Sequence, residues 1–264
     1  MVATTDKLLV ENADGIGVLI LNQPDKRNAI SFDMWQGIGD ALEDLAKDDA
    51  IRAVVISGAG EEAFSAGADI SEFKERRTTP EDREAYDQAM DRAFDRLVNF
   101  PKLTIAMIDG VCVGGGAEVA MDCDVSFASD RARFAITPAR LGLGYGLRDI
   151  TRLVRRVGPS NAKEILASAH FYNAEQALAM GWVNHVVEAE DLADDVLEFA
   201  HVVAANAPLT VKAAKLMVNE ALKAPQDQDR ALCKQLVEDC FQSQDYVEGQ
   251  TAFAEKRRPE FEGR

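Results

Sequence analysis

Hydrophobic positions in the first 60 residues alternate between strand-like and helix-like spacing. Residues 7–24 predict two strands around an Asp-Gly turn. Apolar residues then recur every three or four positions over 32–49, behind Ser31, whose hydroxyl suits a helix N-cap. A short apolar run at 52–58 follows. The pattern therefore predicts strand, strand, helix and strand, and then a loop of small residues at 59–73.

The middle of the chain continues this alternation around three consecutive glycines. A charged segment at 70–99 carries one apolar face and is interrupted at Thr78-Thr79-Pro80, which predicts two helices or a mobile joint. Strands are expected on both sides of the glycines, at 102–110, 124–129 and 133–137. A loop, two helices and a helix–strand segment are expected after them, at 138–149, 150–158, 159–171 and 174–187.

From residue 189 onward the pattern is helical only. Prolines separate the candidate helices, which span 190–205, 208–223, 227–242 and 245–256. A front of alternating strands and helices, followed by a helical back, predicts an α/β core with a helical C-terminal appendage.

Composition narrows the class of partner. The chain has 264 residues, 47% of them hydrophobic, and a formal net charge of −16. That charge argues against nucleic acid or an anionic membrane as a partner, because both need a basic surface. We see no signal-peptide pattern and no apolar run of membrane-spanning length. The four cysteines lack CxxC spacing and the three histidines lack metal-type spacing. We therefore expect free thiols, a cytoplasmic location and no metal site.

The glycine run Gly114–Gly116 is the strongest local candidate for chemistry. It follows an apolar strand and precedes a short helical segment at 117–121. Glycine lets a ligand approach the backbone, and a helix that begins here directs unpaired N–H groups and its positive dipole end outward. Glu118 lies three residues after Gly115, on the same helix face. We expect a backbone donor and a carboxylate in one pocket. The alternative is a strand–turn–helix joint with a surface glutamate.

Six segments, in this order along the chain, carry a resemblance to a known family. They are 22-NQPDKRNAI-30, 64-FSAGADI-70, 109-DGVCVGGGAEVAMDCD-124, 141-LGL-143, 181-GWVNHVV-187 and 253-FAEKRRPEF-261. On these segments the chain resembles the crotonase superfamily, also called the enoyl-CoA hydratase/isomerase family, nearly end to end. The resemblance implies coenzyme A (CoA) thioesters as ligands and a role in fatty acid metabolism.

The resemblance also implies a fold and an assembly. The expected fold is α/β, a crotonase-like spiral of ββα units with a C-terminal helical trimerisation region. Residues 1–200 would form the spiral core with the CoA-binding and active sites, and residues 201–264 the trimerisation region. The expected assembly is a homotrimer or a dimer of trimers.

The chemical step that the family shares is stabilisation of a thioester enolate between two backbone N–H groups. By the family pattern these donors are Ala68 and Gly115, both among small residues where backbone can meet a ligand. Glu118 matches the glutamate of the family's glycine motif and would transfer a proton. The resemblance implies no cofactor beyond the coenzyme A that is part of the substrate.

Positions implied in substrate and CoA binding are spread along the chain. Lys26 and Arg27 match the position that meets CoA phosphates, the alternative being solvated surface cations. Phe253 and Lys256 resemble the pair that reaches a neighbouring subunit's ligand. The remaining implied residues are Ala66, Ala68, Asp69 and Ile70 near the nucleotide, Gly114 in the glycine motif, and Pro138, Leu143 and Tyr145 in the acyl pocket.

The sequence departs from the family's hydratase pattern at one point. Hydratases use a second glutamate after the next strand, and here that position falls on Pro138, or on Ala139 with a one-residue shift. Neither side chain carries a proton, although hydration needs a base for the water and an acid for the α-carbon. Tyr145, Arg148 and Asp149 follow in the next loop as candidate substitutes.

The sequence is compatible with more than one type of reaction. The leading interpretation is an enoyl-CoA hydratase/isomerase-like lyase or isomerase with a single glutamate for proton transfer. The alternatives are an acyl-CoA decarboxylase or hydrolase of the same family, and a CoA-thioester-binding paralogue with little turnover. Arg140 and Arg148 would suit an acyl chain that carries its own carboxylate.

Overall fold

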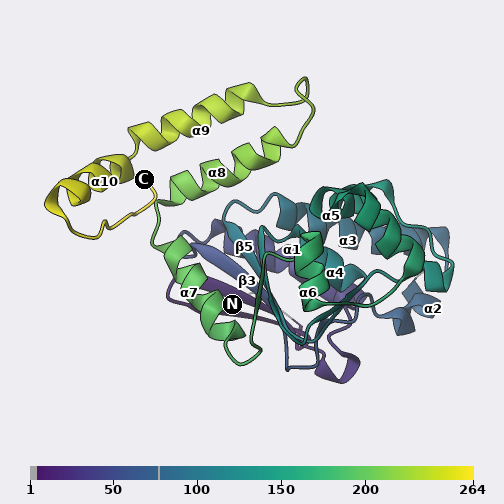
Figure 1. Ribbon diagram of the computed structural model, residues 1–264. Coiled ribbons are helices and arrows are strands. Elements are labelled where there is room, and N and C mark those ends of the chain that lie inside the picture. Colours follow the sequence, from purple (N-terminus) through teal and green to yellow (C-terminus); the bar gives the residue numbers. More distant parts are fainter. Residues whose placement is uncertain (1–4, 77) are drawn as a thin grey trace.

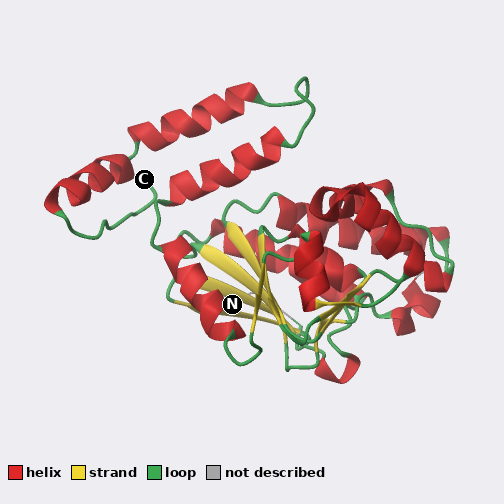
Figure 2. Ribbon diagram, in the orientation of Figure 1, coloured by secondary structure: helices red, strands yellow, loops and turns green. Residues whose placement is uncertain are grey.

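Two β-sheets form the centre of the molecule in a computed structural model, which describes residues 5–76 and 78–264 (Figures 1 and 2). The larger sheet has the strand order β1 (Leu8–Ala13), β2 (Ile16–Leu21), β3 (Ala53–Gly58), β5 (Leu103–Ile108), β7 (Val125–Ser129) and β10 (His185–Val187). Here β1 and β2 form the predicted antiparallel hairpin, and the other neighbouring strands run parallel. The smaller sheet has the order β4 (Ala63–Ser65), β6 (Val111–Val113), β8 (Arg133–Ala135) and β9 (Tyr172–Asn173).

Both sheets are built by a unit that repeats along the chain. In each unit one strand enters the larger sheet, the next strand enters the smaller sheet, and a helical segment follows. The units are β3–β4 with α2 (Phe73–Arg76) and α3 (Pro80–Val98), β5–β6 with α4 (Gly115–Asp122), and β7–β8 with α5 (Leu147–Ser168). The predicted α/β spiral of ββα units is therefore confirmed, and α2 and α3 are the two helices expected around the proline break.

Buried apolar side chains pack on both faces of the larger sheet. On one face they pack with α1 (Phe32–Lys47) and α3, where Trp35 and Phe94 are buried. On the other face they pack with α7 (Leu192–Ala204). Because successive strand side chains point to opposite faces, Val54 joins the first cluster and Val55 the second. This double burial explains why β3 reads as a continuous apolar run.

The predicted N-cap of the first helix is confirmed in detail. The hydroxyl of Ser31 accepts a hydrogen bond from Met34 N at 3.3 Å and caps α1. Gly181 ends α6 (Ala174–Met180) in the left-handed conformation, with φ 77°.

Two predicted segments differ from the structure. Residues 59–73, expected as a loop, contain β4, because a strand of three residues is too short to show an alternating pattern. Residues 111–113 form β6, where only the preceding strand was expected. The two helices expected at 150–158 and 159–171 are present, because α5 consists of two helices joined across a kink at Gly158, whose φ of 76° and ψ of 166° are not helical.

Beyond α7 the chain leaves the sheets as α8 (Pro208–Ala221), α9 (Arg230–Gln242) and α10 (Gln244–Glu255) (Figure 1). The expected boundary between the spiral core (residues 1–200) and the trimerisation region (residues 201–264) falls inside α7, and this division stays a prediction. Among the described residues no helix combines the length and the apolar character needed to cross a membrane. The cytoplasmic location stays a prediction.

Candidate active site

A cavity of about 590 Å³ opens where the start of α4 meets the loop after β4, helix α3 and the loop before α5. Most of the predicted site residues line it: Ala66, Ala68, Ile70, Gly114, Gly115, Glu118, Pro138, Leu143 and Tyr145. The loop after β4 and the start of α4, which are distant in sequence, therefore face the same cavity.

The first bend runs from Ala66 to Asp69 and is held by Ile30. The N–H of Ile30 donates to Gly67 O at 2.7 Å, and its carbonyl accepts from Asp69 N at 2.9 Å. The amides of Ala66 and Gly67 also donate within the protein. In the described part of the chain, Ala68 N has no hydrogen-bond acceptor. Its N–H is therefore available to a group inside the cavity.

The second bend begins α4. Gly114 is the N-cap, with φ 53° and ψ −125°, and its N–H donates to Ala135 O at 3.0 Å. Gly115 is the first helical residue, so its N–H has no intrahelical acceptor, and no other described residue accepts it. An ideal Cβ on Gly115 would lie 3.7 Å from Ala68 N. Two unpaired amides from separate bends therefore lie close together at the cavity wall.

Two glycines allow the bends to come this close. Gly67 has φ +96°, and a Cβ there would lie 2.9 Å from Val113 O. Gly116 lets α4 pack directly against β4, because its Cβ would lie 2.5 Å from Ser65 Cβ. A side chain at either position would push the two bends apart.

Glu118 lies in the first turn of α4 and is only 5% exposed. Burial raises the pKa of its carboxyl group from 4.5 to about 7. A hydrogen bond with Tyr145 lowers this pKa, while the charges of Asp149 and Asp122 raise it further and that of Arg148 lowers it. Burial thus outweighs the helix N-terminus, which favours the charged form. The group can give or take a proton near neutral pH.

The candidate substitutes for the missing glutamate lie next to Glu118. Burial, together with the Glu118 carboxylate, raises the pKa of Tyr145, so its phenol stays a proton donor. Arg148 lies between two carboxylates, and its Nε donates to Asp149 Oδ1 at 3.0 Å while its Nη1 pairs with Asp91 on α3. Arg148 lines the cavity, but its charge is already matched by these partners.

Arg140 is not brought to the cavity. Its exposed side chain lies near Phe171, with the guanidinium carbon 5.8 Å from the ring centroid. The structure therefore does not form the paired arginine site for an acyl carboxylate that Arg140 and Arg148 suggested in the sequence.

A buried ion pair lies one helical turn beyond Glu118. Asp122 Oδ2 and Arg152 Nη1 are 2.6 Å apart, although their geometry is not that of a hydrogen bond. Burial, partly offset by Arg152, raises the pKa of Asp122 to about 7. Helical spacing from Glu118 could have indicated Asp122, but nothing in the sequence indicates its partner.

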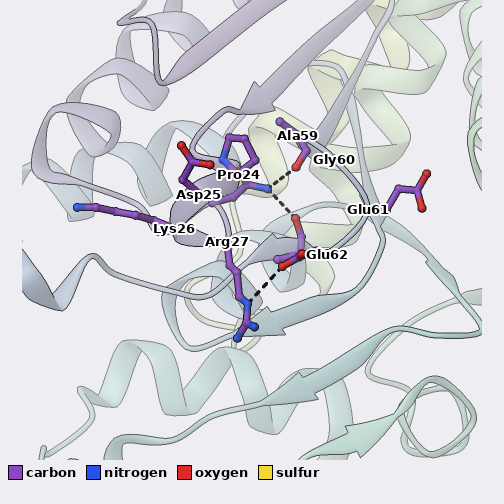
Figure 3. A pocket seen from close by; sticks show the side chains of 10 residues that line it. Pro24, Asp25, Lys26, Arg27, Ala59, Gly60, Glu61 and Glu62 are labelled. Carbon is purple, nitrogen blue, oxygen red and sulfur yellow. Dashed lines mark hydrogen bonds and ion pairs between the residues drawn. The ribbon is translucent and has the colours of Figure 1, made fainter.

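Lys26 and Arg27 line a neighbouring depression of about 620 Å³ rather than the main cavity (Figure 3). Arg27 Nε lies 3.6 Å from Glu62 Oε2, and Figure 3 shows Lys26 pointing away from that pair. Lys26 Nζ donates to the buried carboxylate of Asp69 at 2.7 Å. Asp69 is therefore engaged inside the protein and does not line the main cavity. Contact of these three residues with CoA stays a prediction.

Phe253 and Lys256 lie at the far end of the helices that leave the sheets, remote from the cavity within one chain (Figure 1). Phe253 is 87% exposed and borders an apolar groove of about 610 Å³ between α8 and α10. Their contact with a neighbouring subunit's ligand stays a prediction.

Several cavity residues were not found from the sequence. Trp35 supports the second bend, because a Cβ on Gly115 would lie 3.2 Å from its ring, and its Nε1 donates to Tyr86 Oη at 3.1 Å. Helical periodicity marks Trp35 as buried without showing which bend it supports. Phe73, Met90 and Asp91 also line the cavity.

Comparison with known proteins gives a consistent result. A family model described as enoyl-CoA hydratase/isomerase matches residues 11–264. The chain is 35% identical to the short-chain-enoyl-CoA hydratase of Clostridium acetobutylicum, over 97% of each chain. It is 34% identical to the methylmalonyl-CoA decarboxylase of Escherichia coli, over 94% of this chain and 95% of that one. A crystal structure of an enoyl-CoA hydratase/carnithine racemase from Magnetospirillum magneticum matches with a TM-score of 0.92 and 33% identity, covering 98% of this chain and 97% of that one.

Proposed function

The chain belongs to the enoyl-CoA hydratase/isomerase family, and from that premise we propose that it hydrates or isomerises enoyl-CoA thioesters. The thioester oxygen would lie between the amides of Ala68 and Gly115, and Glu118 would transfer the proton of the α-carbon. The observation that carries the proposal is the pair of unpaired amides beside one buried carboxyl group.

The two amides serve enolate formation. When a nucleophile adds to the conjugated double bond, or when an α-proton leaves, negative charge collects on the thioester oxygen. Fixed N–H donors stabilise that charge more than they stabilise the neutral carbonyl, which is the condition for acceleration. Both amides belong to backbone held by other hydrogen bonds, so little reorganisation is needed during the reaction.

Glu118 suits the proton transfer because its pKa of about 7 lies near the working pH. In its protonated form it can deliver a proton to the α-carbon, and in its charged form it can remove one. We expect kcat/KM for hydration to fall as the pH rises through about 7, because the acid form is lost.

Tyr145→Phe is expected to move this alkaline fall of kcat/KM to higher pH. The hydrogen bond with Tyr145 lowers the pKa of Glu118, so its removal lets burial and the charges of Asp149 and Asp122 raise the pKa further. A pH profile with crotonyl-CoA measures the change. Tyr172→Phe, outside the cavity, is the matched control and should leave the profile in place. A shift to lower pH would contradict the assignment of the fall to Glu118.

The cavity wall favours acyl groups without a carboxylate. Its described lining residues include the acids Asp87, Asp91, Glu118 and Asp149. Arg148 is the only cation among those lining residues, and it already pairs with Asp91 and Asp149. A further carboxylate on the acyl chain would meet negative charge without a free cation. This charge distribution supports hydration or isomerisation over decarboxylation of a malonyl-type thioester, although one relative is a decarboxylase.

A substrate comparison tests the proposal. Crotonyl-CoA should lose its conjugated thioester absorbance rapidly, and methylmalonyl-CoA should bind about tenfold more weakly than butyryl-CoA, which corresponds to about 1.4 kcal/mol. Decarboxylation of methylmalonyl-CoA faster than turnover of any enoyl-CoA would overturn the proposal. Tight CoA-thioester binding without turnover of any substrate would instead indicate a binding paralogue.

We also propose that the chain forms a homotrimer or a dimer of trimers through α8, α9 and α10. What supports this is the exposed apolar surface of these helices, which includes Phe241, Val247 and Phe253. In that assembly Phe253 and Lys256 would contact the CoA bound to a neighbouring subunit. Lys26 and Arg27 would contact the phosphates of the CoA bound to their own subunit. The reaction needs no cofactor beyond the coenzyme A of the substrate.

A further inference from the structure

Hydration requires a base for the attacking water, and the position of the family's second glutamate is Pro138 or Ala139 in this chain. We propose that Asp149 is this base, and therefore the second carboxylate of the site. The inference rests on the proposed function. It adds that the reaction is hydration and that Asp149 is the residue that makes hydration possible.

The first observation is the position of Asp149 in the cavity. Asp149 lies in the first turn of α5 and lines the same cavity as Glu118 and the two unpaired amides. Its side chain is 14% exposed. Its charge acts on both Glu118 and Tyr145, raising the pKa of each, so these groups share one electrostatic environment.

The second observation is that Asp149 does not serve as a helix cap. Gly146 is the N-cap of α5, and no side chain makes a capping hydrogen bond there. Asp149 Oδ1 accepts from Arg148 Nε, whereas no described residue donates to Oδ2. One carboxylate oxygen is thus held in place and the other is free to accept a proton.

The third observation is that Arg148 holds the Asp149 side chain in place. Arg148 is itself tied to α3 by its ion pair with Asp91, so it presents a fixed cation to Asp149. Glu118, by contrast, is buried and takes up a proton near pH 7. Two carboxyl groups in unlike environments provide one base and one acid in the same cavity.

Every proton and electron pair in the proposed hydration step can be accounted for. Asp149 takes a proton from water as the water oxygen bonds to the β-carbon. The electron pair of the double bond moves onto the thioester, whose oxygen is stabilised by Ala68 N and Gly115 N. The enolate returns its electron pair to form the bond between the α-carbon and the proton of Glu118. The proton on Asp149 then passes through solvent to Glu118, and the net change is the addition of water.

The test separates hydration from α-proton exchange. Wild-type enzyme and Asp149→Asn are compared in two assays: hydration of crotonyl-CoA, and exchange of the α-protons of butyryl-CoA in D₂O followed by NMR. Exchange needs the amides and Glu118 but no water base. We expect Asp149→Asn to lose hydration by about 10²–10⁴-fold and to keep exchange within about threefold. Asp95→Asn, exposed on α3 and outside the cavity, is the matched control for both assays.

The outcomes are distinguishable. Hydration retained within about threefold in Asp149→Asn would overturn the assignment, as would an equal loss of both reactions, which indicates a structural role. A wild-type enzyme that exchanges α-protons without hydrating enoyl-CoA would also overturn it, while leaving the amides and Glu118 as proposed. A wild-type enzyme that does neither would contradict the proposed function itself.

Discussion

Glu118→Gln is expected to lower both crotonyl-CoA hydration and α-proton exchange by about 10²–10⁴-fold. Glutamine keeps the size of the side chain and its polar contact with Tyr145, but it cannot deliver or remove a proton. Because the thioester would still meet the amides of Ala68 and Gly115, we expect the affinity for butyryl-CoA to change by less than about threefold. Absorbance, NMR exchange and binding assays on one preparation measure the three quantities.

The matched control is Glu11→Gln, an exposed residue of β1 outside the cavity, which should keep full activity. Normal turnover in Glu118→Gln would rule out Glu118 as the proton-transfer group.

The same variant should be more stable than the wild type at alkaline pH. In the unfolded chain Glu118 ionises near its usual pKa of 4.5, whereas in the folded protein it ionises near 7. Between these values the folded state binds more protons, so stability falls as the pH rises and the loss is complete above about 7. A rise of the pKa from 4.5 to about 7 corresponds to about 3 kcal/mol.

Glutamine does not titrate, so the advantage of Glu118→Gln should appear at pH 8 and disappear near pH 4. Denaturant titrations at both pH values measure it. A gain in stability together with lost activity would also show that the loss is not caused by misfolding.

The sequence predicted the fold well where the pattern is local. The Asp-Gly hairpin, the Ser31 cap and the glycine run each depend on neighbouring residues, and each appears where expected. The strands of the smaller sheet were less visible, because β4 and β6 have three residues each. Such strands owe their conformation to pairing with distant segments, which a local pattern does not contain.

The residues of the candidate site that lie in local motifs could be predicted, and those that depend on contacts between distant segments could not. Ala68, Gly115 and Glu118 lie in motifs with a recognisable spacing, and all three line one cavity. The ion pairs around them join distant positions, such as Arg148 with Asp91, and no spacing rule indicates these partners. The role of Asp149 could therefore be suggested from the sequence but argued only from the arrangement of α3 and α5 around the cavity.

The central claim is that two backbone amides stabilise the thioester oxygen. The most direct measurement removes one N–H without changing any side chain, by replacing Ala68 with its α-hydroxy analogue so that the amide becomes an ester. The same replacement at Ala139, exposed and outside the cavity, is the matched control. Hydration of crotonyl-CoA and binding of butyryl-CoA are then measured for both proteins. The claim predicts a fall in kcat of about 10²–10³-fold at Ala68 with nearly unchanged binding, and no change at Ala139. A loss below about threefold at Ala68, or an equal loss at both positions, would contradict it.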